Sequence, residues 1–238
     1  MSQIVSLSLH RFEGRAAQAW AFAMMGLGRR PLSRVPGIGF WKLCGSGGGV
    51  GFRARPNPAV YAILATWPDE RRAREAIAEA RVFARYRACA AEAWTILLRP
   101  VSARGEWSGR APFVAQPRRG GGPIAALTRG TVRARALPRF WSRVPGISER
   151  IAANDEVLFK IGIGEVPWLH QVTFSVWPDA AAMARFARTG PHAEAIARVR
   201  EEGWFAEDLY ARFEVVGEIG AWAGAPPLAP DDDLQETA

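Results

Sequence analysis

The sequence predicts an α+β protein made of two tandem ferredoxin-like β-α-β-β-α-β repeats, which close into a dimeric α+β-barrel-type arrangement within one chain. Two observations support this prediction. Short motifs recur in the same order roughly 110 residues apart, and the strand-like and helix-like segments of both halves follow one order. With 238 residues, 49% of them hydrophobic, the chain is long enough to bury an ordinary core without a disulfide or a metal.

The recurring motifs set the predicted boundaries. The matching pairs are, by residue number, 33–38 (SRVPGI) with 142–147, 67–69 (WPD) with 177–179, Trp94 with Trp204, and 105–109 with 220–224. We therefore predict a first repeat over residues 1–108 and a second over 123–224. Residues 109–122, rich in Gly, Pro and Arg, are the predicted linker, and 225–238 are a predicted acidic, disordered tail.

In the first repeat, periodicity and composition indicate six elements. They are strand Ile4–Leu9, helix Gly14–Leu27, strands Gly39–Cys44 and Val60–Trp67, a helix that begins after Asp69, and strand Trp94–Val101. Asp69 is the expected N-cap of its helix. The glycine run Gly45–Gly51 lacks the spacing of a dinucleotide-binding fingerprint and is followed by Pro56, so we expect a flexible loop there.

The second repeat follows the same order. Its predicted elements are strand Ile124–Val132, helix Leu137–Ala153, strands Val157–Ile163 and His170–Trp177, a helix that begins after Asp179, and strand Leu209–Val216. The chain has no nucleophile elbow, no phosphate loop and no HExxH motif, which argues against those hydrolase and nucleotide-binding classes.

Charge and cysteine content suggest the setting. The net charge is +8, and residues 101–140 contain eight Arg against one acid, Glu106. Such a segment is most simply a solvated surface, and it also fits peripheral contact with an anionic membrane. Because no RNA- or DNA-binding signature is present, we expect no nucleic acid partner. The sequence shows no apolar run that spans a bilayer, no signal peptide and no metal-binding cysteine pattern, so a reducing cytoplasmic location is expected.

His192 is the most informative of the three histidines. It follows Pro191 at the start of a predicted helical segment, and Ile196 and Val199 share its apolar face. The positive end of the helix dipole favours neutral imidazole, which is the form that binds iron. A histidine that only forms a hydrogen bond at a helix start is the plainer interpretation. The matching position in the first repeat is Val82, so the chain has at most one such site.

His170 begins a strand whose alternation places Val172, Phe174 and Val176 on its own face. We expect this face to meet the helices, so that His170 and His192 approach one cavity. Trp168 and Phe174 are the candidate substrate-binding residues, with ordinary core positions as an equally weighted alternative. His10 is expected at a strand edge.

Several segments resemble one protein family. Phe159–Phe174 and Phe186–Ile196 are similar to the spheroidene monooxygenase family, the carotenoid ketolases of purple phototrophic bacteria, and so are shorter stretches at 21–27, 100–105 and 107–110. The resemblance spans nearly the whole chain. It implies oxidation of spheroidene at C-2 by O2 to give spheroidenone, with haem as cofactor and an external electron donor such as a ferredoxin. Because a carotenoid is dissolved in lipid, we also expect peripheral association with the photosynthetic membrane.

The resemblance does not settle the axial ligand. Related haem-binding α+β barrel proteins, of the chlorite dismutase and haem-degrading kind, have a helical histidine where His192 stands. We therefore expect His192 to hold the haem iron, flanked by Ile196 and Val199, with His170 as the catalytic residue near bound O2 or as the ligand if the two are reversed. The sequence contains no dinucleotide-binding fingerprint, which argues against a flavin cofactor.

Two alternatives remain open. One is a non-haem iron oxygenase that uses His170, His192 and either Glu194 or Glu165 as a facial triad. The other is a non-enzymatic barrel that binds haem or an apolar ligand. A visible absorption spectrum separates haem from non-haem iron, and a turnover assay separates an enzyme from a binding protein.

Overall fold

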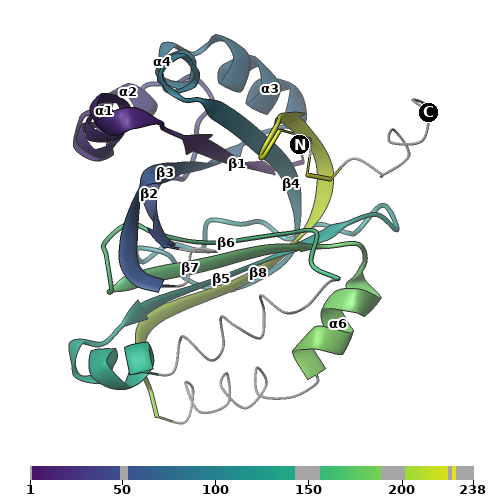
Figure 1. Ribbon diagram of the computed structural model, residues 1–238. Coiled ribbons are helices and arrows are strands. Elements are labelled where there is room, and N and C mark those ends of the chain that lie inside the picture. The colour runs from purple at the N-terminus through teal and green to yellow at the C-terminus, as the bar shows by residue number, and fades with distance from the viewer. Residues whose placement is uncertain (1, 49–52, 143–155, 189–201, 225–226, 229–238) are drawn as a thin grey trace, which may run out of the picture.

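Eight antiparallel strands form one closed barrel in the computed structural model, which describes residues 2–48, 53–142, 156–188, 202–224 and 227–228 (Figure 1). The strands are β1 (Ile4–Arg11), β2 (Trp41–Gly48), β3 (Arg53–Trp67), β4 (Glu92–Gly105), β5 (Ile124–Val132), β6 (Phe159–Gly164), β7 (His170–Trp177) and β8 (Phe205–Gly220). Their order around the barrel is β1-β3-β2-β6-β7-β5-β8-β4. The α+β class and the barrel closure predicted from the sequence are thus confirmed.

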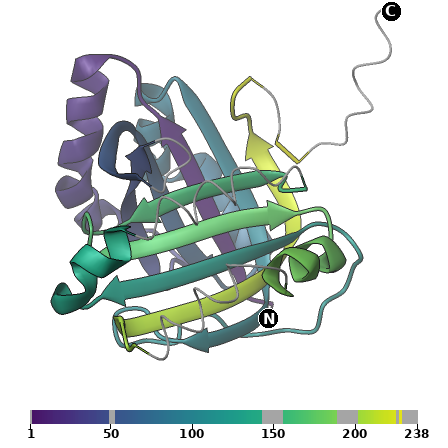
Figure 2. The ribbon, with the colours of Figure 1, turned by 60° about the horizontal axis from the view of Figure 1, so that its bottom comes forward.

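The helices lie outside the barrel. They are α1 (Gly14–Leu27), α2 (Arg29–Leu32), α3 (Glu70–Glu79), α4 (Arg81–Cys89), the 3-10 turn η1 (Ala134–Ala136) and α6 (Ala180–Arg188). Helices α1, α3 and α4 cover the β1–β4 half, and α6 lies against the β5–β8 half, as Figures 1 and 2 show. Within the described residues, no helix is both long and apolar enough to cross a membrane.

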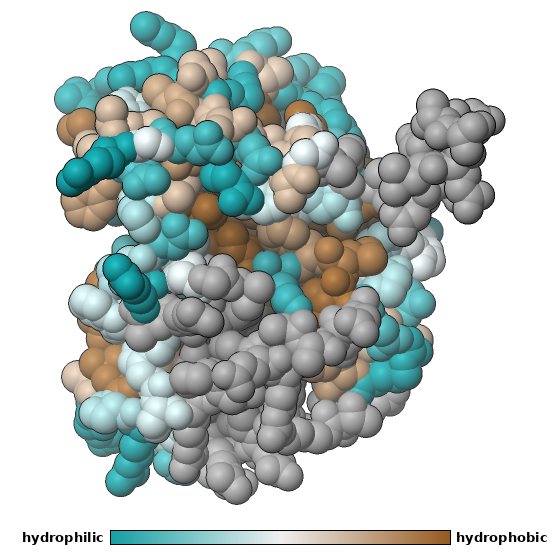
Figure 3. Space-filling view, viewed as in Figure 1, coloured by the Kyte–Doolittle hydropathy of each residue, from teal (hydrophilic) through white to brown (hydrophobic). Residues whose placement is uncertain are grey.

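The barrel interior is filled by one alternate set of side chains from all eight strands. Val5, Leu7 and Leu9 of β1 belong to this cluster, as do Phe174 of β7 and Phe213 of β8. Figure 3 shows apolar atoms gathered between the upper and lower halves in the view of Figure 1. A barrel packed with side chains leaves its ends and its outer faces as the places for a site.

The packing of β7 differs from the expected one. Val172, Phe174 and Val176 were expected to face the helices, but they belong to the cluster in the barrel interior. The opposite row meets the helix layer, because Trp177 packs with Ala182 and Met183 of α6. The apolar row of a strand faces the larger core, and in a closed barrel this core lies inside rather than under the helices.

Most predicted elements match the observed ones. Helix Gly14–Leu27 and strands Ile124–Val132 and His170–Trp177 have the predicted bounds. The Asp69 carboxylate accepts a hydrogen bond from Arg72 N at 2.8 Å, so the predicted N-cap is confirmed. Asp179 likewise accepts from Ala182 N at 2.7 Å.

The glycine run was only partly a loop. Gly45–Gly48 continues β2 and pairs with β3, with Gly45 opposite Tyr61 and Gly47 opposite Pro56, across two register shifts. Glycine is tolerated at such irregular positions in a strand, where the sequence alone suggests a loop. Residues 49–52 lie outside the described residues.

The predicted linker and tail also have placed residues. Phe113 of the linker is buried and its ring lies 5.1 Å from that of Phe213, so this connection packs on the core. Leu228 packs against the barrel cluster, while residues 225–226 and 229–238 lie outside the described residues. Most of the predicted helix Leu137–Ala153 lies outside them as well.

Candidate active site

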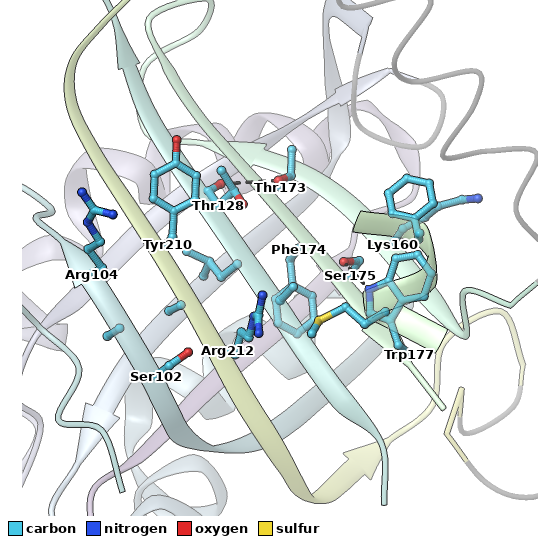
Figure 4. A pocket seen from close by; sticks show the side chains of 16 residues that line it. Ser102, Arg104, Thr128, Lys160, Thr173, Phe174, Ser175, Trp177, Tyr210 and Arg212 are labelled. Atoms are coloured by element: carbon cyan, nitrogen blue, oxygen red, sulfur yellow. Dashed lines mark hydrogen bonds between the residues drawn. The ribbon is translucent and has the colours of Figure 1, made fainter. Parts of the chain in front are cut away.

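A cavity of about 340 Å³ lies on the outer face of the β5–β8 half, beside α6 (Figure 4). Its apolar lining includes Ala126, Trp177, Met183 and Phe186. The rings of Trp177 and Phe186 are 5.0 Å apart, and Trp177 donates a hydrogen bond to Ser175 Oγ at 3.0 Å. The strands thus supply the floor of a largely apolar cavity, and α6 supplies one wall; we call this cavity the slot.

Positive charge and hydroxyl groups surround this slot. The cations are Arg104, Lys160 and Arg212, and the described lining contains no Asp or Glu. Arg104 and Arg212 come from neighbouring strands β4 and β8, and neither forms an ion pair within the described residues. The hydroxyl-bearing residues are Ser102, Thr128, Thr173, Ser175 and Tyr210. An apolar slot with unmatched guanidinium groups suits a planar apolar ligand that carries anionic groups.

This lining fits part of what haem requires. A haem needs an apolar slot, cations for its carboxylates and an axial ligand. The described lining supplies the first two, but it contains no His or Cys. His192, Ile196, Val199 and Glu194 lie outside the described residues, so their expected roles stay predictions.

His170 lies at one end of the barrel, within a polar cluster that continues the inward-facing rows. We define the barrel-end network as Lys42, Trp107, Arg129, Glu165, His170 and Glu207. Glu165 accepts from Trp107 Nε1 at 2.6 Å and pairs with Lys42 at 2.7 Å. His170 Nδ1 is 3.5 Å from Glu165 Oε2, is buried, and has no hydrogen-bond partner.

The second ion pair of this network has a fully buried cation and a partly exposed carboxylate. Arg129 is 1% exposed, pairs with Glu207, and lies with its guanidinium 5.7 Å from the centre of the Trp107 ring. Glu207 also accepts from Ser108 N at 2.9 Å and Gly109 N at 2.7 Å. The network thus ties the chain after β4 to β5 and β8.

The electrostatic surroundings favour neutral His170. Burial lowers its pKa below the ordinary value, and Arg129 and Lys42 lower it further, while Glu165 and Glu207 oppose the shift. A neutral imidazole near pH 7 can accept a proton or bind a metal.

The facial-triad alternative is not tested by the described residues, because they include only His170 and Glu165 of its members. His170 and Glu165 are close, but Glu165 is already held by Lys42 and Trp107. Among the described residues, no group of three His, Cys, Asp or Glu side chains is placed to hold a metal. His192 and Glu194 lie outside this part of the chain.

A second, wider groove of about 550 Å³ runs between α1 and the turn from β6 to β7. Trp168 and His170 line it, together with Phe22, Met25 and Trp141. Trp168 is 52% exposed and has a φ of 65°, a conformation in which few residues other than glycine are found.

The structure therefore separates residues that we expected at one cavity. Trp168 and His170 line the groove, whereas Phe174 lines the cavity beside α6 and packs in the barrel core. The cationic lining residues Arg104, Lys160 and Arg212 were missed. The polar row of β8, which alternates with Leu209, Ala211 and Phe213, was the available signal for the last of these.

His10 was also misjudged. It is 2% exposed rather than at an edge, and its ring lies 5.1 Å from that of Tyr86. Its side chain contacts Tyr86 of α4, and β1 has no free edge because β3 and β4 pair with it on both sides. A closed barrel has no edge strand, which the sequence of one strand does not reveal.

Comparison with known proteins places the chain among relatives of one activity. It is 49% identical over 240 residues to the spheroidene monooxygenase of Rhodobacter capsulatus, with 99% of both chains covered. It is 48% identical over 229 residues to that of Cereibacter sphaeroides, covering 95% of this chain and 71% of the relative. No family model matches the chain.

A solved structure supports the fold alone. An aldoxime dehydratase in complex with butyraldoxime has a TM-score of 0.59 at 12% identity, with 90% of this chain and 80% of the other covered. A barrel with helices outside it is thus also the fold of an enzyme that is named for another reaction. The residues of the site must identify the chemistry.

Proposed function

The chain belongs to the spheroidene monooxygenase family, and on that premise we propose that it oxidises spheroidene at C-2 to spheroidenone with O2 and haem. The observation that most supports haem is the cavity beside α6, with its apolar floor and three cations but no acid in the described lining. When bound, haem supplies the chemistry that activates O2 for oxidation of a C–H bond. The electrons come from an external donor such as a ferredoxin.

We assign roles to the residues of this chain as follows. Trp177, Met183 and Phe186 would exclude water from the cavity, and Arg104 and Arg212 would pair with the haem carboxylates. His192 is the residue proposed to hold the iron, and the helical spacing places Ile196 and Val199 on its face. These three residues follow from the sequence argument, since they lie outside the described residues.

The substrate contacts are proposed for two places. Trp168 binds the polyene in the groove, where His170 is the proposed catalytic residue and is kept neutral by its surroundings. Phe174 contributes to the wall of the cavity beside α6. The cavity and the groove share no lining residue, so each contact is proposed from its own lining.

We also propose that the two halves are tandem ferredoxin-like repeats. The strand order β2-β3-β1-β4 of the first half corresponds to β6-β7-β5-β8 of the second. Trp67 at the end of β3 pairs with Ile4 at the start of β1, and Trp177 at the end of β7 pairs with Ile124 at the start of β5. These correspondences support the repeat boundaries 1–108 and 123–224.

The test of this function is spectroscopic and kinetic. The purified chain supplied with haem is expected to show a Soret band and to form the keto carotenoid with O2 and reductant. His192→Ala is expected to retain at least tenfold less haem and to lose ketolase activity, because imidazole is the proposed iron ligand. His170→Ala is expected to keep its haem and lose rate, roughly 100-fold if it acts in proton transfer.

Three outcomes would overturn parts of this proposal. Normal haem content in His192→Ala means that another residue is the ligand. Activity with bound iron but no Soret band means a non-haem oxygenase. A Soret band without any turnover of carotenoid means a haem-binding protein rather than this enzyme.

The cavity cations give an independent test. Arg104→Ala and Arg212→Ala are each expected to weaken haem binding roughly tenfold, because a charge-assisted hydrogen bond contributes about 1.5–3 kcal/mol. Arg72→Ala, on exposed α3, is the matched control and should leave haem affinity unchanged. Haem titration followed by absorbance measures all three. Equal affinity of the wild type and both cavity variants would place the haem elsewhere.

A further inference from the structure

Helix α1 presents an apolar surface to the outside of the molecule. Its 14 residues include one charge, Arg15. Ala21 and Met24 pack inward, while Phe22 is 73% and Leu27 is 70% exposed. A helix that is apolar on both its inner and outer faces normally has something covering the outer one.

Neighbouring elements extend this surface. Phe22 and Met25 line the same groove as Val166 and Trp168, which belong to the turn from β6 to β7. Val166 is 40% exposed. In Figure 2 this turn lies between α1 and the helical turn that follows β5. We call Phe22, Leu27, Val166 and Trp168 the apolar face.

The apolar face contains most of the large hydrophobic side chains that are exposed. The described residues have six of these, and the apolar face accounts for four, with Val114 and Leu158 as the other two. Single exposed hydrophobic residues are ordinary, but three of these four line one groove, and such a group marks an interaction site.

The charge around the apolar face is mostly positive, and the acid that lines the groove, Glu165, is paired with Lys42. Residues 14–42 contain Arg15, Arg29, Arg30, Arg34 and Lys42 and no acid. The four arginines are exposed, and Arg29 lies with its guanidinium 5.7 Å from the centre of the Trp41 ring.

A second group of cations lies across the groove. Arg133, Arg135 and Arg139 are exposed in the segment that leads to Trp141, which lines the groove. A partner that contacts the apolar face therefore meets exposed arginines on both sides, of which Arg139 pairs with Glu202 at 3.9 Å. This pattern, aromatic and aliphatic residues flanked by arginines, is typical of a helix that lies in the headgroup region of an anionic bilayer.

We propose that the apolar face is a membrane-docking surface, on which α1 lies in the plane of an anionic bilayer with Phe22 and Leu27 inserted. The proposal rests on the proposed function, because spheroidene is dissolved in the membrane. The groove has its exposed lining on this face, so a polyene can enter it from lipid without crossing water.

The structure also limits which part of residues 101–140 is able to make the membrane contact that the sequence predicts for this segment. Arg129 of that segment is buried in the barrel-end network, and Arg104 lines the cavity beside α6. The arginines of this segment therefore do not form one continuous surface. Only residues 133–139 lead to the groove.

Vesicle flotation tests the proposal with carotenoid-free vesicles of phosphatidylcholine, with and without phosphatidylglycerol. The wild type is expected to bind the anionic vesicles, and less so at high salt. Phe22→Gln/Leu27→Gln is expected to lower the partition coefficient roughly tenfold or more, since two large apolar side chains no longer enter the lipid. Arg30→Glu should reduce the preference for anionic lipid.

Val114→Gln is the matched control. Val114 is 62% exposed and donates its backbone N–H to Gln3, just before β1 begins, whereas α1 follows the end of β1. Its variant should bind vesicles as the wild type does. Unchanged binding by the double variant, or an equal loss in Val114→Gln, would overturn the proposal.

A second copy of the chain is the competing occupant. If the double variant turns a dimer into a monomer in sedimentation while its vesicle binding is unchanged, the apolar face is a dimer interface and the proposal is wrong. Because the vesicles hold no carotenoid, binding is measured independently of turnover. A chain that docks but oxidises no carotenoid contradicts the proposed function only.

Discussion

Glu207→Ala is expected to lower the free energy of unfolding by up to about 3–5 kcal/mol, the range for leaving one charge of an ion pair buried without its partner. Its partner Arg129 is 1% exposed and loses the carboxylate that it pairs with. The variant also leaves the backbone N–H groups of Ser108 and Gly109 without their acceptor. Urea unfolding at pH 7 measures the loss as a lower midpoint with an unchanged slope.

The reverse substitution separates charge from packing. Arg129→Met removes the buried cation and leaves Glu207, which is partly exposed and still accepts from two N–H groups. We expect it to be less destabilising than Glu207→Ala. The double variant Arg129→Met/Glu207→Gln should recover at least half of the loss, since no unpaired charge remains buried. A loss below about 1 kcal/mol in Glu207→Ala would show that the cation finds another partner.

The barrel-end network illustrates what sequence patterns can and cannot predict. Alternation correctly gave strands at β5 and β7, so the places of Arg129 and His170 along their strands were predictable. Their partners were not, because Lys42, Glu165 and Glu207 come from three other segments that meet only when the barrel closes. Pairing at such sequence distances depends on strand order, which a one-dimensional pattern does not contain.

The two faces of β7 make the same point about the site. The apolar row of β7 was predicted correctly, but the prediction that this row faces the helices was wrong. An open sheet buries its apolar row under the helices, whereas a closed barrel buries it in the interior. The polar row with Thr173 and Ser175 therefore lines the cavity beside α6. Helix caps such as Asp69 were predictable because they depend on neighbouring residues alone.

The stability of the chain is expected to fall steeply as pH falls from about 6 to 4, and His10 is the main single histidine responsible. Burial, together with the charge of Arg87, lowers the pKa of His10 to about 3. Its Nδ1 is buried without a hydrogen-bond partner, and the Phe12 and Tyr86 rings pack around it. The folded chain therefore keeps His10 neutral at pH values where the unfolded chain binds a proton.

The direction of the effect follows from this difference. Below the unfolded pKa of about 6.5, only the unfolded state gains the proton, so each further pH unit costs up to about 1.4 kcal/mol until the folded pKa is reached. Between pH 7 and pH 4 the wild type should lose about 3 kcal/mol through His10 alone. His10→Leu, which has no titratable group, should lack this part of the loss at every pH in that range.

The measurement is urea unfolding of both proteins at several pH values, read as the difference between them. Taking the difference removes the contribution of the carboxylates that titrate in the same range, such as Glu207. Burial raises the pKa of Glu207, but the N–H groups of Gly109 and Ser108 and the charge of Arg129 bring this pKa below its usual value. His170→Leu is the matched control, because His170 is only partly buried and its pKa is lowered with two carboxylates opposing the shift. It should change the slope less than His10→Leu does. Parallel pH profiles for the wild type and His10→Leu would mean that water or a local opening admits the proton to the folded chain, and that the pocket between β1 and α4 is not as closed as its packing indicates.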